Sequence, residues 1–84
     1  MTETTPSQRL GTMAILIANR EQVSAINSII SQHERLIIGR MGLPYREKRV
    51  NIIVLLVEGS GGELGAFSDK LGAVTGVKVQ SVEF

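Results

Sequence analysis

The chain has 84 residues, no cysteine, and nine basic against eight acidic side chains, which gives a formal net charge of +1. This length predicts one small domain at residues 9–84, with a core of modest size. The absence of cysteine excludes disulfides and thiolate metal sites as its support, which leaves self-association. The balanced charge disfavours direct binding of nucleic acid, which usually requires a clustered basic surface.

The polar residues 1–8 are expected to form a disordered tail, because they lack the basic and apolar regions of a signal peptide. No apolar run approaches the roughly 20 residues that a membrane span needs. We therefore expect a cytoplasmic protein that does not enter membranes.

The first predicted strand covers residues 9–18, RLGTMAILIA, and is expected to be central because both of its faces are apolar. One face carries Met13, Ile15 and Ile17, and the other carries Ala14, Leu16 and Ala18. Asn19 then ends the strand as an N-cap, since its side-chain oxygen can accept from the backbone N–H of Glu21 or Gln22. Apolar residues at helical spacing after Val23 predict a helix over residues 20–32 or 20–33.

A hairpin over residues 36–58 is the centre of the predicted fold. It reads LIIGRMG, then LPYREKR, then VNIIVLLVE. Gly42 and Pro44 are expected to stop its first strand, in which Ile37 and Gly39 should share one face. Its second strand is apolar on both faces, which predicts burial on both sides.

A second helix is predicted after the hairpin, and Ser60 and Glu63 form its expected capping box. Its apolar stripe consists of Leu64, Phe67, Leu71 and Val74. Gly65 and Gly72 weaken such a helix by about 1 kcal/mol each relative to alanine, so we expect close packing at both. Gly76 is placed to end the helix in the left-handed conformation.

Apolar and polar residues alternate along residues 77–84, VKVQSVEF, which are expected to form an edge strand. The resulting order β-α-β-β-α-β is that of an α+β, ferredoxin-like fold, with two helices on one face of a four-stranded antiparallel sheet. Because the first and third strands are apolar on both faces, the uncovered face would be an apolar patch, which is typical of an interaction surface. We therefore expect a homo-oligomer, a dimer or a tetramer, that associates sheet to sheet or edge to edge.

The hairpin tip carries a basic cluster that consists of Arg40, Arg46, Lys48 and Arg49, with Tyr45 among them. The cluster is either a site for an anion or an acidic partner, or a solvated tip that Glu47 partly neutralises. Solvated charge runs are common, so the second interpretation is favoured at this point. Turn chemistry does not explain why Arg40 lies inside an otherwise apolar strand.

Asn19 and Arg20 lie at the first strand-to-helix turn, where backbone N–H groups can hold a carboxylate or a phosphate. A simple N-cap is the commoner use of asparagine at this position. His33 is the single histidine, so neither a metal site nor another cofactor site is expected. Arg20 and Asn51 could imitate the arginine and asparagine pair of acylphosphatases, but the first turn lacks their glycine-bearing phosphate loop, and a non-enzymatic function is favoured.

Residues 13–30, MAILIANREQVSAINSII, resemble the start of an ACT-type regulatory domain. Such domains bind amino acids or other small effectors at subunit interfaces. Asn19 and Arg20 match the usual Asp-Arg pair of these domains. The resemblance implies an ACT-like domain with an effector site at this turn.

The segment IIGRMGLPYRE, the apolar strand after it and the later DKLGAVTGVKV resemble the iron-only hydrogenase system regulators over residues 10–82. This resemblance implies an ACT-like fold similar to the effector domain of the nickel-responsive repressor, an assembly of two or more chains, and a role in regulation, including transcriptional regulation. One histidine and no cysteine do not provide the nickel site of that repressor. The segment before Arg9 is too short for a DNA-binding unit, so no direct contact of this chain with nucleic acid is expected.

The sequence therefore predicts a small regulatory protein that forms homo-oligomers and senses an effector or contacts a protein partner. The predicted binding residues are Asn19, Arg20, Arg40, Tyr45 and Arg46, and no catalytic residue is expected. One alternative is a structural or adaptor module without a small ligand. A third function considered is that of a small hydrolase of the acylphosphatase type.

Overall fold

The computed structural model describes residues 8–84, so the expected tail at residues 1–8 lies, except for Gln8, outside the described residues. The main elements are β1 (Arg9–Ile17), α1 (Val23–Gln32), β2 (Ile37–Tyr45), β3 (Val50–Gly59), α2 (Gly61–Gly72) and β4 (Val77–Glu83). Three short 3-10 turns, η1 (Arg20–Gln22), η2 (Glu34–Leu36) and η3 (Arg46–Lys48), precede α1, β2 and β3. Across residues 8–84, no helix combines the length and the apolar character that crossing a membrane requires.

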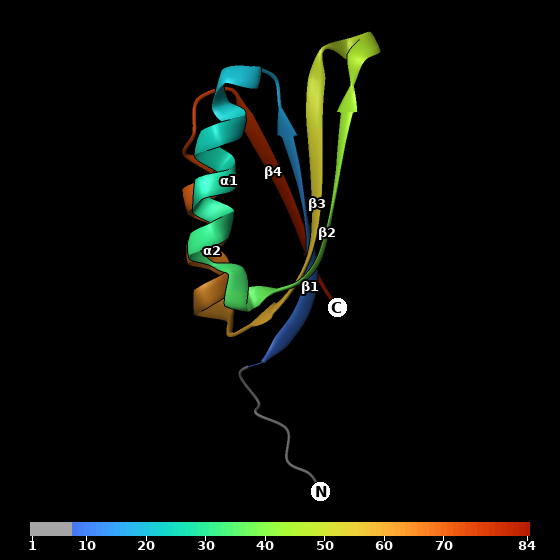
Figure 1. Cartoon of the computed structure of the whole chain (residues 1–84). Coiled ribbons are helices and arrows are strands. Elements are labelled where there is room, and N and C mark those ends of the chain that lie inside the picture. Colours follow the sequence, from blue (N-terminus) through green and yellow to red (C-terminus); the bar gives the residue numbers. More distant parts are fainter. Residues whose placement is uncertain (1–7) are drawn as a thin grey trace, which may run out of the picture.

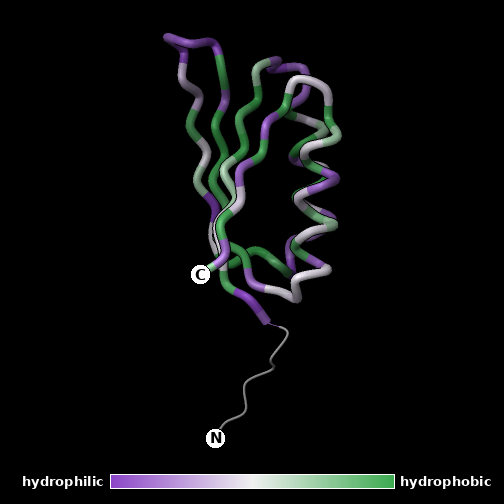
Figure 2. The backbone as a smooth tube through the Cα atoms, turned by 180° about the vertical axis from the view of Figure 1, so that it is seen from behind, coloured by the Kyte–Doolittle hydropathy of each residue, from purple (hydrophilic) through white to green (hydrophobic). Residues whose placement is uncertain are grey.

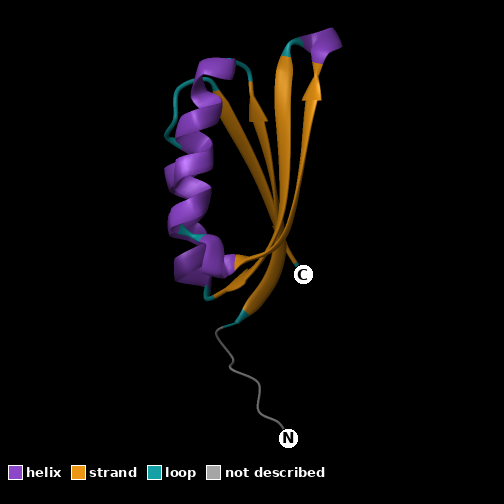
Figure 3. Cartoon of the chain, viewed as in Figure 1, coloured by secondary structure: helices purple, strands orange, loops and turns teal. Residues whose placement is uncertain are grey.

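The four strands form one antiparallel sheet in the order β2-β3-β1-β4. Both helices lie on the same face of this sheet, and none of the described elements covers the opposite face (Figures 1 and 3). The predicted α+β, ferredoxin-like and ACT-like βαββαβ fold is thereby confirmed. The central position of β1 and the edge position of β4 also agree with the prediction.

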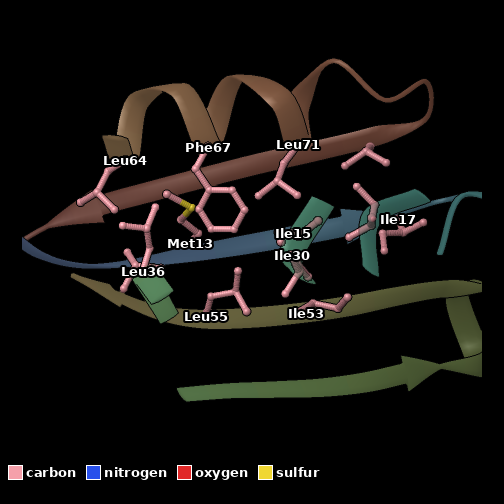
Figure 4. Packing of buried hydrophobic residues seen from close by; sticks show 13 residues of the cluster. Met13, Ile15, Ile17, Ile30, Leu36, Ile53, Leu55, Leu64, Phe67 and Leu71 are labelled. Carbon is pink, nitrogen blue, oxygen red and sulfur yellow. The ribbon is translucent and has the colours of Figure 1, made fainter. Parts of the chain in front are cut away.

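The hydrophobic core lies between the two helices and the sheet. Odd-numbered residues of β1 and β3 supply its sheet side and are at most 5% exposed: Met13, Ile15, Ile17, Ile53, Leu55 and Val57. The helices contribute Ile26, Ile30, Leu64, Phe67 and Leu71. Figure 4 shows Phe67 reaching from α2 to Met13 on β1. Because side chains alternate along a strand, the even-numbered residues of β1 and β3 face away from the helices.

Helix α2 begins with the predicted capping box. The Ser60 hydroxyl accepts a hydrogen bond from the Glu63 N–H at 3.1 Å, and the Glu63 carboxylate accepts one from the Ser60 N–H at 3.0 Å. The backbone hydrogen bond from Ser60 is the largest cause that lowers the pKa of Glu63, and the hydrogen bond from Arg35 is the next. The cap therefore favours the ionised form of this carboxylate.

The first helix begins later than its pattern predicts. Asn19 accepts from the Glu21 N–H at 2.9 Å, as expected of an N-cap. The first three residues after it form η1, however, and α1 itself starts at Val23. Gln22 makes no side-chain capping bond, so the second half of a capping box is missing here.

Strand β2 continues through Gly42 and Pro44 to Tyr45, so the prediction that these two residues stop the strand is wrong. β2 lies at the edge of the sheet. An edge strand tolerates proline, because an N–H on its free side has no ladder partner to lose.

The faces of β2 also differ from the prediction. A register shift between Ile37 and Gly39 marks a β-bulge, in which Ile37 pairs with Val57 and Gly39 with Leu56. Directly paired residues share a face, so Ile37 lies on the helix side and Gly39 on the opposite side. The prediction that these two residues share one face is therefore wrong, and Arg40 turns toward the helices.

Close packing does not account for Gly65. A Cβ atom added there would meet no heavy atom within 4 Å, whereas one at Gly72 would touch Val79 at 4.0 Å. The expectation of close packing is therefore wrong for Gly65, and Gly72 makes an ordinary contact. Gly76 has a φ of +79° and ends the segment in the predicted left-handed conformation.

Candidate functional site

A pocket of about 560 Å³ lies where the β2–β3 hairpin meets the start of the first helical segment. β1 ends at Ile17, which pairs with Asn51, and the hairpin continues past this point to its tip (Figure 1). The lining residues are Arg20, Pro44, Tyr45, Arg46, Arg49, Val50 and Asn51. We call this the tip pocket, and it is a partly open depression rather than an enclosed cavity.

The hairpin turn that forms one wall of the tip pocket holds an arginine in a strained conformation. Arg49 follows η3 with a φ of 56° and a ψ of 40°, and its N–H donates to the carbonyl of Arg46 at 3.1 Å. Across residues 8–84, Arg49 is the one residue other than glycine with a positive φ. This region costs a residue with a Cβ atom roughly 1–2 kcal/mol, and glycine usually occupies it.

The tip pocket is cationic. Arg20, Arg46 and Arg49 line it, and no acidic residue does. The ion pairs of the described residues lie elsewhere: Arg9 with Glu83 at 2.9 Å, and Arg35 with Glu63 at 2.6 Å. Guanidinium groups stay charged at any physiological pH, so the pocket has a permanent positive charge.

The remaining lining residues complete a site that fits an organic anion. The planar guanidinium group can form two parallel hydrogen bonds to a carboxylate or a phosphate. The Asn51 amide can both donate and accept, and Pro44, Tyr45 and Val50 add apolar surface. The charged and apolar groups can therefore bind the two ends of one small molecule.

The structure brings together three of the five predicted binding residues. Those that line the tip pocket are Arg20, Tyr45 and Arg46. Asn19 and Arg40 lie outside the lining: the Asn19 side chain caps η1, and Arg40 donates to Asn27 Oδ1 on α1 at 3.1 Å. This hydrogen bond gives the arginine inside the apolar strand a structural role.

Arg49 and Asn51 line the pocket but were not among the predicted binding residues. Arg49 belonged to the basic cluster, and its left-handed conformation has no signature in the sequence. Asn51 could have been found from the strand register, because its pairing with Ile17 places it beside the turn that carries Arg20. Arg20 and Asn51, which could imitate the arginine and asparagine pair of acylphosphatases, both line this pocket.

His33 has structural contacts. Its Nδ1 donates to the carbonyl of Ile29 at 2.8 Å, and its ring stacks on Phe67 with centroids 4.6 Å apart and 17° between the planes. In the part of the chain that the structure describes, no three His, Asp or Glu side chains are arranged to share a metal ion.

The sheet face opposite the helices, which we call the outer face, is a second candidate site. Its large apolar side chains are 38–79% exposed: Leu10, Met41, Leu43, Tyr45, Leu56, Val82 and Phe84. Leu55 is fully buried under the helices, whereas its neighbour Leu56 is 44% exposed on the outer face. Figure 2 shows strands that are largely hydrophobic along their length and a hydrophilic hairpin tip. Exposed apolar patches of this kind usually mark binding surfaces.

Comparison with protein families matches residues 9–81 to the TM1266-like family, described as "Iron-only hydrogenase system regulator, putative". Among solved structures, the uncharacterized protein TM1266 from Thermotoga maritima is similar, with a TM-score of 0.86 and 31% identity over 92% of this chain and 98% of that chain. The C-terminal domain of the MgtC protein from Mycobacterium tuberculosis has a TM-score of 0.68 and 11% identity over 98% of this chain and 94% of that one, a likeness of fold alone. A search of curated proteins gives no match. The family match extends over nearly the whole chain, which therefore belongs to the TM1266-like family of iron-only hydrogenase system regulators.

Proposed function

We propose that the protein is a small regulatory module of hydrogenase-related systems that works as a homo-oligomer and responds to a small effector or a protein partner. The family supports the regulatory role. The exposed outer face is the observation that carries the proposal, because it gives a physical reason for self-association. The tip pocket offers a place for an effector.

The helices cover only one face of the sheet, and the exposed outer face favours self-association. In a single chain, Met41 is 63% and Leu43 is 55% exposed on the outer face. Burial of apolar surface stabilises by about 25 cal/mol per Å², and a small domain without disulfides has few other sources of stability. A second copy offers the same apolar face. Pairing of two outer faces therefore buries apolar surface on both copies.

A single substitution on the outer face tests this arrangement. A lysine in place of Leu56 stays solvated in a monomer but would be buried without a partner charge in the oligomer. We expect light-scattering chromatography to give a dimer or tetramer for the wild type and a folded monomer for Leu56→Lys. The matched control is Ala66→Lys, which adds the same charge at an exposed position of α2 and should keep the wild-type mass.

Two outcomes of that experiment count against the proposed interface. A monomeric wild type at micromolar concentration would remove self-association altogether. An oligomer that survives Leu56→Lys would place the interface at a sheet edge, at β2 or β4, instead of the outer face.

The predicted binding residues have two roles in this proposal. Those that line the tip pocket contact the effector. Asn19 holds the turn that carries Arg20, and Arg40 ties β2 to α1 through Asn27, so both position the walls. An oligomer that binds no ligand in this pocket would instead be the structural or adaptor module considered above.

A small hydrolase of the acylphosphatase type is a second candidate, favoured by the presence of Arg20 and Asn51 in one pocket. The guanidinium group would bind the phosphate, and the amide would orient a water molecule. Release of phosphate from acetyl phosphate tests this function. Turnover that both Arg20→Ala and Asn51→Ala abolish would make the protein an enzyme, whereas a rate equal to that of buffer would remove this candidate.

A further inference from the structure

We propose that the tip pocket binds a small phosphorylated organic molecule, and that Arg49 is a principal contact for its phosphate. This inference deepens the proposed function, because it names the ligand class of the effector, and it rests on that function for its biological role. Three observations carry it: the charge of the lining, the backbone conformation of Arg49, and the apolar surface beside the arginines.

The charge of the lining favours phosphate over a single carboxylate. Three guanidinium groups gather in one pocket without an acidic lining residue, in a chain whose formal net charge is +1. A phosphate monoester carries about −1.5 to −2 charges at pH 7 and three strong acceptor oxygens. It can therefore accept from several arginines at once, whereas a carboxylate has one charge and two oxygens.

The backbone conformation of Arg49 is the second observation. Its φ of 56° would suit glycine better than arginine. Backbone strain of this kind is often found at binding sites, where the surrounding structure holds a side chain in place for function. Here the residue with the positive φ is one of the three arginines that line the pocket.

The apolar lining favours a small organic molecule over a free anion or a nucleic acid strand. Pro44, Tyr45 and Val50 line the pocket together with the arginines. Tyr45 and its pair partner Val50 lie on the outer-face side of the hairpin, so Pro44 is the apolar residue on the helix side against which a flat ring can lie. A nucleic acid strand would need a basic groove with several stacking aromatic residues. The aromatic residues of the whole chain are one tyrosine and two phenylalanines, and Phe67 is buried in the core.

Calorimetric titration of the full chain tests this inference with AMP and phenyl phosphate, each of which joins a phosphate to a flat ring. We expect both to bind, and adenosine, benzoate and inorganic phosphate to bind at least about tenfold more weakly. Binding of neither ester would overturn the proposal. Equal binding of benzoate or inorganic phosphate, or tighter binding of a single-stranded oligonucleotide than of AMP, would overturn the ligand class.

Variants of the lining separate binding from folding. Arg49→Gly removes a guanidinium group and relieves the backbone strain, so it should weaken AMP binding at least about tenfold while the melting temperature stays equal or rises. Arg46→Ala should weaken binding similarly. The matched control is Lys70→Ala, which removes a positive charge at an exposed position of α2, outside the pocket lining, and should leave binding unchanged. Wild-type affinity in both Arg49→Gly and Arg46→Ala would place the phosphate elsewhere.

Measuring the molecular mass of the same samples separates a failure of this inference from a failure of the proposed function. Loss of AMP binding in an intact oligomer identifies a defect of the tip pocket alone. A monomer that binds AMP with dependence on Arg49 would contradict the proposed assembly and support the ligand site.

Discussion

Replacement of Gly65 by alanine is expected to stabilise the fold by about 1 kcal/mol. Gly65 is exposed in the interior of α2, where glycine is less favourable than alanine by about 0.8–1.0 kcal/mol. A Cβ atom at this position meets no heavy atom within 4 Å. No steric cost therefore offsets the gain in helix propensity.

Thermal and urea unfolding at a fixed protein concentration measure this gain. For a domain of this size, 1 kcal/mol raises the melting temperature by about 4–8 °C. Gly76→Ala is the matched control and should lower stability, because Gly76 has a φ of +79°. A neutral or destabilising Gly65→Ala would refute the reasoning.

Two further predictions concern the core and the second helix cap. Phe67→Ala removes a fully buried side chain and should cost about 3–5 kcal/mol, measured as a lower urea midpoint, whereas an unchanged midpoint would contradict the packing described here. The pKa of Glu63 is lowered from 4.5 in the folded state, so its stabilising effect is present above the unfolded pKa and is lost as the pH falls through the folded pKa. The stability difference between wild type and Glu63→Gln should therefore shrink on acidification, and a difference that is constant with pH would show that the carboxylate does not stabilise the cap.

The order of elements and the helix-facing core could be predicted because they depend on local pattern. Alternation along β1 placed Met13, Ile15 and Ile17 on one face, as the structure has them, and cap chemistry at Ser60 located the start of α2. These signals lie within a few residues of the feature that they specify, so one sequence is sufficient to read them.

Strand β2 and the tip pocket depend on pairing between distant segments. The bulge after Ile37 has no local signature, because Ile37 and Ile38 are the same residue type, and yet it turns Arg40 toward α1. The pocket joins Arg20 to a hairpin tip more than twenty residues later in the chain. Its lining could therefore not be assigned from spacing, although three of its residues were among the predicted binding residues.

Two methionine methyl groups offer the most direct test of self-association through the outer face. Met13 is 1% exposed in the core, and Met41 is 63% exposed on the outer face. In an equimolar mixture of ¹³C-methyl-methionine protein and unlabelled protein, isotope-filtered NOE spectra report contacts between different copies. Pairing of outer faces predicts such contacts from the Met41 methyl to apolar side chains of the second copy, and none from Met13. A spectrum without contacts from Met41, together with a monomeric mass, would contradict self-association through this face.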